Sequence, residues 1–270
     1  MQPSEYAQFV DIHLAALEAH EARHNRMLDV LLRTGPQPRE GFLTWTLGGP
    51  GQCAIRISSK GPLIIGDADE DQCRELAEQT LALDYQSVEG PGQTATWFSQ
   101  CAGELGLTFA DPSQQRIHAL SGRPAYPSGP GNSRLATPEE TDIVVDWAME
   151  FAREALPGHP PPQRTSFQRI VSETLFWLVD DEPVSMAAIV RRTRHAGAIS
   201  LVYTPPQLRN RGYAGAVVAA VVERIYAERR TIACLYTDLK NPISNRCYAK
   251  IGFRPVCDAF FYLRRKGVGP

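Results

Sequence analysis

The chain has 270 residues, which is enough for one large domain or two small ones. Its 43% hydrophobic and 21% charged residues are typical of a soluble globular protein, and a formal net charge of −2 gives no electrostatic reason to expect a nucleic-acid partner. No apolar run approaches the roughly 18 residues of a membrane span, so we expect no membrane association. Residues 1–13 show no basic and apolar leader, and the six cysteines form no C-x-x-C pair, which favours a cytoplasmic protein with reduced thiols.

The first predicted element is a long helix over residues 4–33, which contains the sequence His20-Glu-Ala-Arg-His24. The pattern H-E-x-x-H is that of the zinc-binding helix of metalloproteases. The glycine of the extended motif is absent, and no third ligand is indicated. His24 shares a helical face with Leu17 and Leu28, so we interpret it as a structural histidine and predict no metal. A zinc metalloprotease acting through His20 and His24 is a minor alternative.

The rest of the N-terminal half alternates short strands and helices. Apolar and turn patterns predict strands at 42–47, 53–58, 63–65 and 116–120, and helices at 70–83 and 93–105. This order predicts an α/β domain over residues 1–123.

Residues 124–133 are dense in proline, glycine and serine, which indicates a linker or a long connection. We therefore predict a second domain over residues 132–270. Its predicted order is strand, helix, helix, three strands, helix, strand, helix and closing strands, at 133–136, 137–155, 167–173, 174–179, 184–192, 198–204, 215–229, 231–237, 241–252, 253–256 and 259–263.

The strand that ends near Thr204 runs into a Pro-Pro break and then a loop, Arg209-Asn210-Arg211-Gly212-Tyr213-Ala214, that opens a helix at Gly215. Backbone N–H groups and the helix dipole both attract an anion at a helix N-terminus, so this arrangement indicates a phosphate site. Gly212 lets the backbone approach a ligand closely, and the arginines add positive charge. The loop matches neither G-x-G-x-x-G nor a P-loop, and a tight strand-to-helix turn without a ligand is the alternative interpretation.

A second pattern follows about thirty residues later. Asn241, Ser244 and Tyr248 fall at i, i+3 and i+7 of a short helix, and Gly252-Phe253 follows them. The loop resembles the R-x-x-G-x-[GA] pyrophosphate loop of the GNAT superfamily of N-acetyltransferases, and this second segment resembles the superfamily's N-x-x-[AS]-x-x-x-Y-x-x-x-G-[FY]. Each pattern is weak alone, and a core tyrosine is the alternative for Tyr248. The two patterns in this order and at this separation are specific together.

The resemblance covers residues 133–263, about half of the chain. It implies an α/β fold with a mixed sheet, an acyl-CoA-binding domain in this half, and acetyl-CoA as co-substrate. The strand end would splay from the strand at 231–237 and pair with the pantetheine arm, while the loop would hold the pyrophosphate. The candidate cofactor-binding residues are Val202, Tyr203, Thr204, Arg209, Asn210, Arg211, Gly212, Tyr213, Ala214, Gly215, Asn241 and Ser244.

The resemblance also implies direct transfer of the acetyl group to an amine, with Tyr248 as the catalytic residue that protonates the leaving CoA thiolate. The strand before the loop supplies no Asp or Glu as a base. Glu182 and His195 are the nearest polar candidates in sequence, and neither is assigned. The acceptor is the amine of a small molecule or peptide, and it is undefined because acceptor choice depends on variable loops such as 157–164.

An acyl-CoA-binding sensor or pseudoenzyme remains an alternative, against which Tyr248 argues. The element order of residues 1–123 is similar to that of a degenerate second copy of the same fold. Glu89-Gly-Pro91-Gly-Gln93 would occupy the place of the phosphate loop in that copy. It has no arginine, and Pro91 lacks an amide donor, so we expect no second cofactor site.

Overall fold

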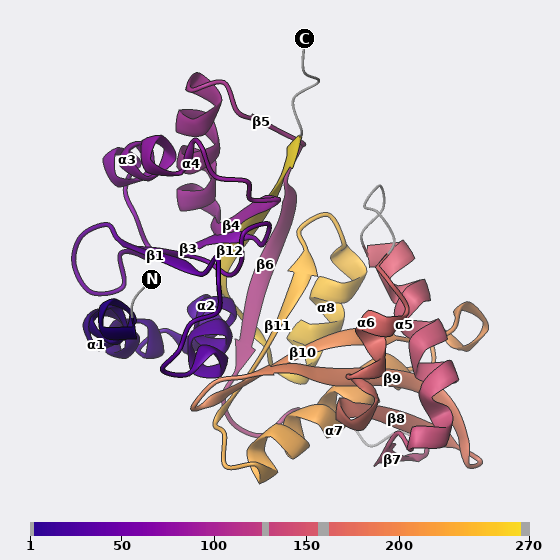
Figure 1. Ribbon diagram of the computed structural model, residues 1–270. Helices are drawn as coiled ribbons and strands as arrows, with labels where there is room; N and C mark the ends of the chain where they lie inside the picture. Colours follow the sequence, from indigo (N-terminus) through magenta and orange to yellow (C-terminus); the bar gives the residue numbers. More distant parts are fainter. Residues whose placement is uncertain (1–2, 126–129, 156–161, 266–270) are drawn as a thin grey trace. The chain divides into compact units, whose positions relative to one another are not determined.

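The computed structural model describes residues 3–125, 130–155 and 162–265 (Figure 1). The predicted connection at 124–133 lies partly outside the described residues, as does the variable loop at 157–164. The chain divides into two compact units, Met1–Ile117 with Val256–Pro270, and His118–Pro255. The compact units differ from the predicted domains 1–123 and 132–270 in one respect: the chain from Val256 onward belongs to the first unit. That residues 1–123 and 132–270 fold as domains stays a prediction.

The first unit begins with two helices, α1 (Pro3–Glu18) and α2 (Glu21–Thr34), where the sequence predicts one. The helix ends before His20, whose φ and ψ are −131° and 50°. The break lets the apolar faces of both helices bury against one cluster, in which the rings of Tyr6 and Phe42 pack edge to face at 5.6 Å. Burial of two apolar faces therefore outweighs continuation of the helix.

The sheet of the first unit has the order β1-β2-β3-β4-β12. Only the β3–β4 pair is parallel; the other neighbours in this order are antiparallel. The elements after α2 are β1 (Leu43–Thr46), β2 (Cys53–Arg56), β3 (Leu63–Ile65), α3 (Glu70–Thr80), β4 (Ser87–Pro91), α4 (Gly92–Glu104), β5 (Thr108–Phe109) and β6 (Ser113–Leu120), with β12 (Arg254–Arg265) returning from the end of the chain. One strand, β12, replaces the two predicted closing strands.

The second unit contains β7 (Asn132–Leu135), η1 (Pro138–Glu140), α5 (Thr141–Ala155), α6 (Thr165–Gln168), η2 (Val171–Glu173), β8 (Thr174–Val179), β9 (Glu182–Arg192), β10 (Ala196–Tyr203), η3 (Pro206–Leu208), α7 (Tyr213–Ala227), β11 (Ile232–Asp238) and α8 (Pro242–Ile251). Its sheet has the order β7-β8-β9-β10-β11, in which only β10 and β11 pair in parallel. Asp180 and Asp181 turn the β8–β9 hairpin with φ of 51° and 63°, as two-residue hairpin turns require.

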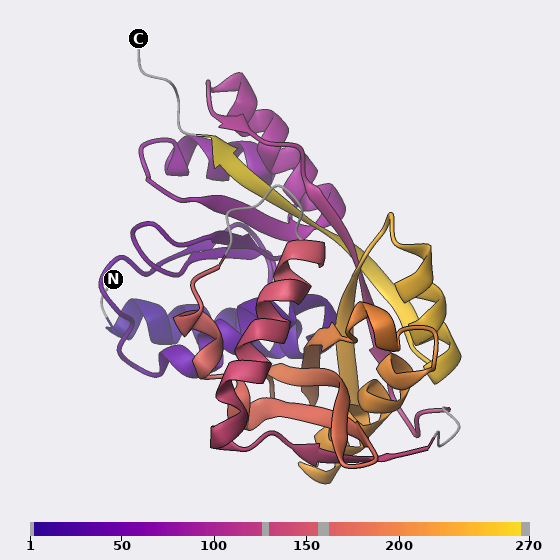
Figure 2. The same ribbon diagram turned by 90° about the vertical axis from the view of Figure 1, so that its right-hand side faces the viewer.

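Helices cover both faces of this sheet because its strands are apolar on both sides. Leu175 and Trp177 of β8 lie in one cluster with the Ala- and Val-rich face of α7. The alternating residues Phe176 and Leu178 lie in another cluster with Val144 and Ala148 of α5, the helix that crosses the face seen in Figure 2. The predicted α/β fold with a mixed sheet is thereby confirmed. None of the helices in the described ranges is long and apolar enough to span a bilayer.

The two units share one order of connections. In each, three antiparallel strands are followed by a helix, a strand parallel to the third, and a second helix. The helix after the third strand is α3 in the first unit and α7 in the second. The counterpart of the loop before α7 is therefore the segment 66–69, and the prediction that Glu89–Gln93 occupies this place is wrong. Those residues belong to β4 and α4, which follow one another directly at Pro91 and Gly92.

Candidate functional site

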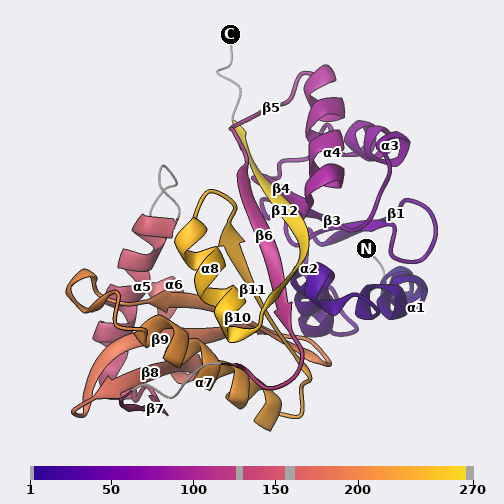
Figure 3. The same cartoon turned by 180° about the vertical axis from the view of Figure 1, so that it is seen from behind.

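The end of β10 carries a bulge and separates from β11. The two strands pair from Ala196 opposite Ile232 to Ile199 opposite Leu235, and then point apart (Figures 1 and 3). Leu201 has a φ of 53°, which L-residues with large side chains rarely adopt, and the pairing with β9 shifts register between Ser200 and Tyr203. The predicted cofactor-binding residues of this strand, 202–204, thus lie just past the last β10–β11 pair.

Side chains from a neighbouring strand hold this strand end. The buried hydroxyl of Ser185 on β9 donates to the carbonyl oxygen of Tyr203 at 3.0 Å, and its oxygen lies 2.9 Å from the Thr204 hydroxyl. Because Ser185 has a single proton, the Thr204 hydroxyl is the donor in the second bond. The bulged end of β10 is therefore fixed by side-chain hydrogen bonds that the sequence does not reveal.

The predicted phosphate loop lies between this strand end and α7. Residues 209–212 are exposed, and Asn210 and Gly212 both have left-handed φ, of 64° and 85°. Gly212 is the N-cap of α7, and no side chain of the described residues caps this helix. Tyr213 and Ala214 are half-buried and Gly215 is buried. The first turn of α7 thus presents its dipole and backbone N–H groups beside an exposed loop, as a phosphate site requires.

The side chain of Arg209 contacts the strand end and α5. Its Nε donates to the Thr204 carbonyl oxygen at 2.9 Å, and its Nη2 donates to both carboxylate oxygens of Glu154 at 2.7 and 2.9 Å. Its guanidinium carbon also lies 5.8 Å from the centre of the Tyr203 ring. Arg211, by contrast, is exposed and has no ion pair among the described residues.

The second predicted pattern lies on α8. Asn241 caps this helix, because its Oδ1 accepts the backbone N–H of Ser244 at 3.1 Å. Tyr248 is 9% exposed, packs edge to face on Phe253 at 6.1 Å, and belongs to the same hydrophobic cluster as Ala216 of α7. Burial raises the pKa of Tyr248, so its hydroxyl stays protonated at neutral pH.

A buried polar network ties the first turn of α8 to the end of β11. The Thr237 hydroxyl donates to Asn245 Oδ1 at 2.6 Å, and His118 Nε2 lies 3.0 Å from the Thr237 oxygen. Thr237 has one proton, so His118 Nε2 is the donor in the second bond. Asn245 and Tyr248 are three residues apart on one helical face. The network therefore orients the helix that carries Tyr248, and no pattern in the sequence indicates it.

The two polar residues considered as bases lie at opposite ends of the sheet. Glu182 is exposed at the β8–β9 hairpin. His195 is exposed at the start of β10, whereas the candidate site lies at the end of that strand. His195 is therefore at the far end of the sheet from the site. Glu182 is at the site's end, because Met186 of β9 pairs with Tyr203 at the end of β10, but no contact with the described site residues assigns it as the base.

The H-E-x-x-H residues do not share the arrangement of a zinc helix. His20 is exposed and precedes α2, while His24 is buried inside α2 with its Nε2 3.4 Å from an oxygen of Asp67. Across residues 3–125, 130–155 and 162–265, no three or more His, Cys, Asp or Glu side chains form a group that could hold a metal ion. His24 thus has the contacts of a structural histidine.

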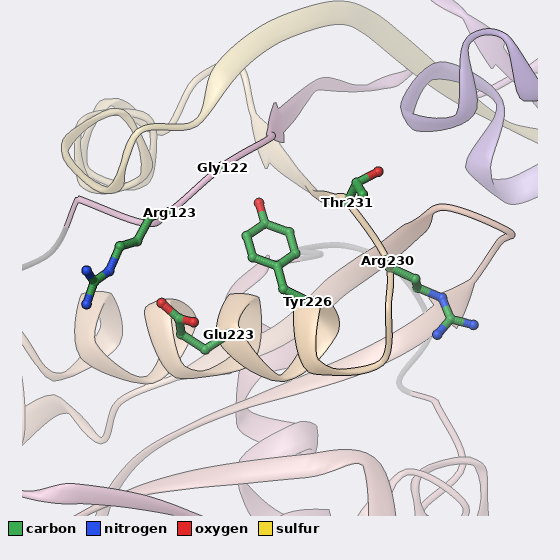
Figure 4. A pocket seen from close by; sticks show the side chains of 6 residues that line it. All are labelled: Gly122, Arg123, Glu223, Tyr226, Arg230 and Thr231. Carbon is green, nitrogen blue, oxygen red and sulfur yellow. The ribbon is translucent and has the colours of Figure 1, made fainter.

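A surface pocket of about 530 Å³ lies at the other end of α7 (Figure 4). Glu223, Tyr226 and Arg230 line it, and Arg123 approaches from the chain before β7. Glu223 is 11 residues beyond Gly212, or ~16 Å along the helix. This pocket is therefore separate from the candidate phosphate loop.

In the first unit, carboxylates occupy the place that corresponds to the phosphate loop. Asp69 caps α3: its side chain accepts the N–H of Gln72 at 2.9 Å, and the Gln72 side chain accepts the N–H of Asp69 at 3.0 Å. Asp67 accepts two hydrogen bonds from Arg23, at 2.9 and 2.6 Å. The Asp69 carboxylate thus satisfies one N–H group of α3, and negative charge at this helix N-terminus disfavours an added anion.

Comparison with known proteins agrees with the two-motif resemblance. Residues 177–261 match the family model described as FR47-like protein. No curated protein has a sequence similar enough to match this chain.

Solved structures resemble the whole chain. A GCN5-related N-acetyltransferase from Kribbella flavida has a TM-score of 0.59 at 16% identity, over 90% of this chain and 95% of its own. A Drosophila protein has a TM-score of 0.66 at 16% identity, over 97% of both chains. A tandem GNAT protein from the clavulanic acid biosynthesis pathway has a TM-score of 0.50 at 12% identity, over 90% of this chain and 88% of its own. The chain therefore has the fold of the GCN5-related N-acetyltransferases, as its two motifs predict.

Proposed function

We propose that the second unit transfers the acetyl group of acetyl-CoA to the amine of a small molecule or peptide. The observation that carries the proposal is the course of β10, which bulges at Leu201, leaves β11, and leads into a helix whose first turn has no side-chain cap. A separated strand offers main-chain groups to the amides of a pantetheine arm, and the uncapped helix offers N–H groups to a pyrophosphate.

In this proposal the backbone at 202–204 pairs with pantetheine, and the amides of 210–215 hold the pyrophosphate with Arg211 beside them. Asn241 and Ser244 lie on the opposite wall, at the start of α8. Asn241 already uses its Oδ1 to cap this helix, so the side-chain N–H groups are what it offers to pantetheine.

The chemistry follows from this placement. The amine nitrogen attacks the thioester carbon, the C–S bond breaks, and the electron pair goes to sulfur. Tyr248 lies two turns along α8 from Asn241 and donates its proton to the departing thiolate. Its burial keeps the phenol protonated until that step. The amine must be neutral to attack, so a base or a water chain removes its proton, and no residue is assigned to this step.

The experiment that tests this function is a screen of amines and amino acids with acetyl-CoA, monitored by release of the CoA thiol. We expect acceptor-dependent thiol release that Tyr248→Phe reduces. A chain that binds acetyl-CoA but releases no thiol with any amine, amino acid or peptide would instead support the acyl-CoA sensor.

A further inference from the structure

We propose that Arg209 is a positioning residue that holds the end of β10, and that Glu154 of α5 keeps it in place. The inference deepens the proposed function and rests on it, because it assigns a role within the proposed acetyl-CoA site. It differs from the expectation, based on the loop motif, that the Arg209 guanidinium binds the pyrophosphate.

The contacts of the guanidinium carry the inference. Its Nε donates to the carbonyl of Thr204, the residue directly after the bulged strand, and its Nη2 donates to both carboxylate oxygens of Glu154. A planar group held at two edges and placed over the Tyr203 ring has a fixed orientation. That orientation points toward α5 and the strand end.

The same contacts connect α5 to the strand that would pair with pantetheine. The ring of Tyr203, the last residue of β10, contacts both the Arg209 guanidinium and, at 5.9 Å, the ring of Trp147 from the middle of α5. Ser185 bonds to the carbonyl of Tyr203, and Arg209 bonds to the carbonyl of Thr204. Two successive carbonyls at the bulged end are thus held by side chains from two different elements.

Charge supports the same assignment. Glu154 neutralises Arg209, so an arriving pyrophosphate meets the loop amides and Arg211. A lysine at position 209 keeps the charge but loses the planar fork that reaches both Thr204 and Glu154. Arginine is therefore required for geometry here, and its charge is secondary.

Binding measurements with two ligands distinguish an Arg209 that holds the strand end from an Arg209 that binds the pyrophosphate. Acetyl-CoA contains the pyrophosphate, whereas S-acetylpantetheine contains only the thioester and the pantetheine arm. We expect Arg209→Lys to weaken binding of both ligands by a similar factor, about tenfold, because both depend on the strand end. We expect Glu154→Gln to weaken both as well. If Arg209 binds the pyrophosphate, Arg209→Lys leaves S-acetylpantetheine binding unchanged, and Glu154→Gln leaves acetyl-CoA binding unchanged or tighter; either result overturns the inference.

Arg153 provides a matched control. It is the preceding residue on the same turn of α5, is exposed, and pairs with Glu150. Arg153→Lys should leave the affinity for both ligands within about twofold of the unchanged chain. A loss equal to that of Arg209→Lys would show that any arginine exchange near this turn has the same effect.

A stability cycle on the unliganded chain tests the pairing independently of acetyl-CoA. Arg209→Lys should lower the melting temperature in the normal chain and much less in the Glu154→Gln background, because the partner is already gone. Equal losses in both backgrounds would contradict the Arg209–Glu154 contact. If the unchanged chain fails to bind acetyl-CoA, the proposed function fails, while this cycle still decides whether Arg209 holds the strand end.

Discussion

Asp69 and Gly212 occupy equivalent N-cap positions in the two units, at the start of α3 and α7. The Asp69 carboxylate bonds to an N–H group of its own helix, whereas Gly212 has no side chain and adopts a left-handed φ of 85°. Asp69 thus places the chain's own negative charge at the start of its helix, whereas Gly212 brings no side-chain cap to the start of α7.

This difference predicts one acetyl-CoA per chain, bound by the second unit. The amides of α3 are capped, and the carboxylates of Asp67 and Asp69 repel phosphate. Isothermal calorimetry should return a stoichiometry of one. Asp69→Gly, which removes the cap, should lower stability without changing the stoichiometry, because Asp67 remains; two equivalent sites in the unchanged chain would contradict the closed first unit.

Tyr248→Phe should reduce turnover about 10²-fold and change acetyl-CoA affinity by less than about threefold. The substitution keeps the ring that packs on Phe253 and removes only the hydroxyl. The melting temperature should therefore stay close to that of the unchanged chain. Near-normal turnover, with chemistry shown to limit the rate, would return Tyr248 to the role of a core tyrosine.

Removal of metal should leave acyl transfer intact. His20 is exposed and precedes α2, whereas His24 is buried with its Nε2 3.4 Å from an oxygen of Asp67. Treatment with a chelator should leave thiol release unchanged, and elemental analysis should find no stoichiometric zinc. One zinc per chain that is lost in His24→Ala would instead support the metalloprotease interpretation.

The stability of the first unit should fall in acid through Asp67. Its hydrogen bond with His24, followed by its contacts with Arg23, lowers the pKa of Asp67 from 3.8 to about 2. The carboxylate therefore contributes stability above pH ~4 that is lost as the pH falls toward 2. Because the side chain is 43% exposed, the contribution is about 1 kcal/mol or less.

Denaturant unfolding from pH 2 to 7 checks this effect. Asp67→Asn should lower the free energy of unfolding at pH 7 and converge with the unchanged chain near pH 2. Asp71→Asn, at an exposed acid in the first turn of α3, is the matched control. Identical pH profiles for Asp67→Asn and the unchanged chain would remove Asp67 from the stabilising contacts.

The sequence predicts the parts of the site that are continuous in the chain. The loop at 209–214 and the residues Asn241 and Tyr248 are recognisable because the functions proposed for them depend on spacing along one loop and one helix. The bulge at Leu201 is not recognisable, since leucine has no preference for positive φ and the conformation is imposed by pairing with β9.

Contacts between distant residues account for most of what the sequence does not predict. Glu154 and Arg209 are 55 positions apart, and nothing in either local pattern indicates their pairing. The break before His20 arises because α1 and α2 pack against a shared cluster, which periodicity cannot reveal. The strand at 63–65 and the helix from residue 70 are both predicted, so the mistaken place of the first unit's phosphate loop arises from assigning it to the glycine-containing segment 89–93, which instead belongs to β4 and α4.

Thermal unfolding with added acetyl-CoA tests the central claim most directly. A ligand that binds only the folded chain raises its melting temperature. We expect a micromolar dissociation constant for acetyl-CoA, which corresponds to a binding free energy of about −8 kcal/mol. We predict that acetyl-CoA and CoA both stabilise the chain, that NADH does not, and that Gly212→Val removes the effect by placing a branched Cβ at a left-handed φ in the loop. No shift of the melting temperature at saturating acetyl-CoA would contradict the assignment of the second unit as an acetyl-CoA site.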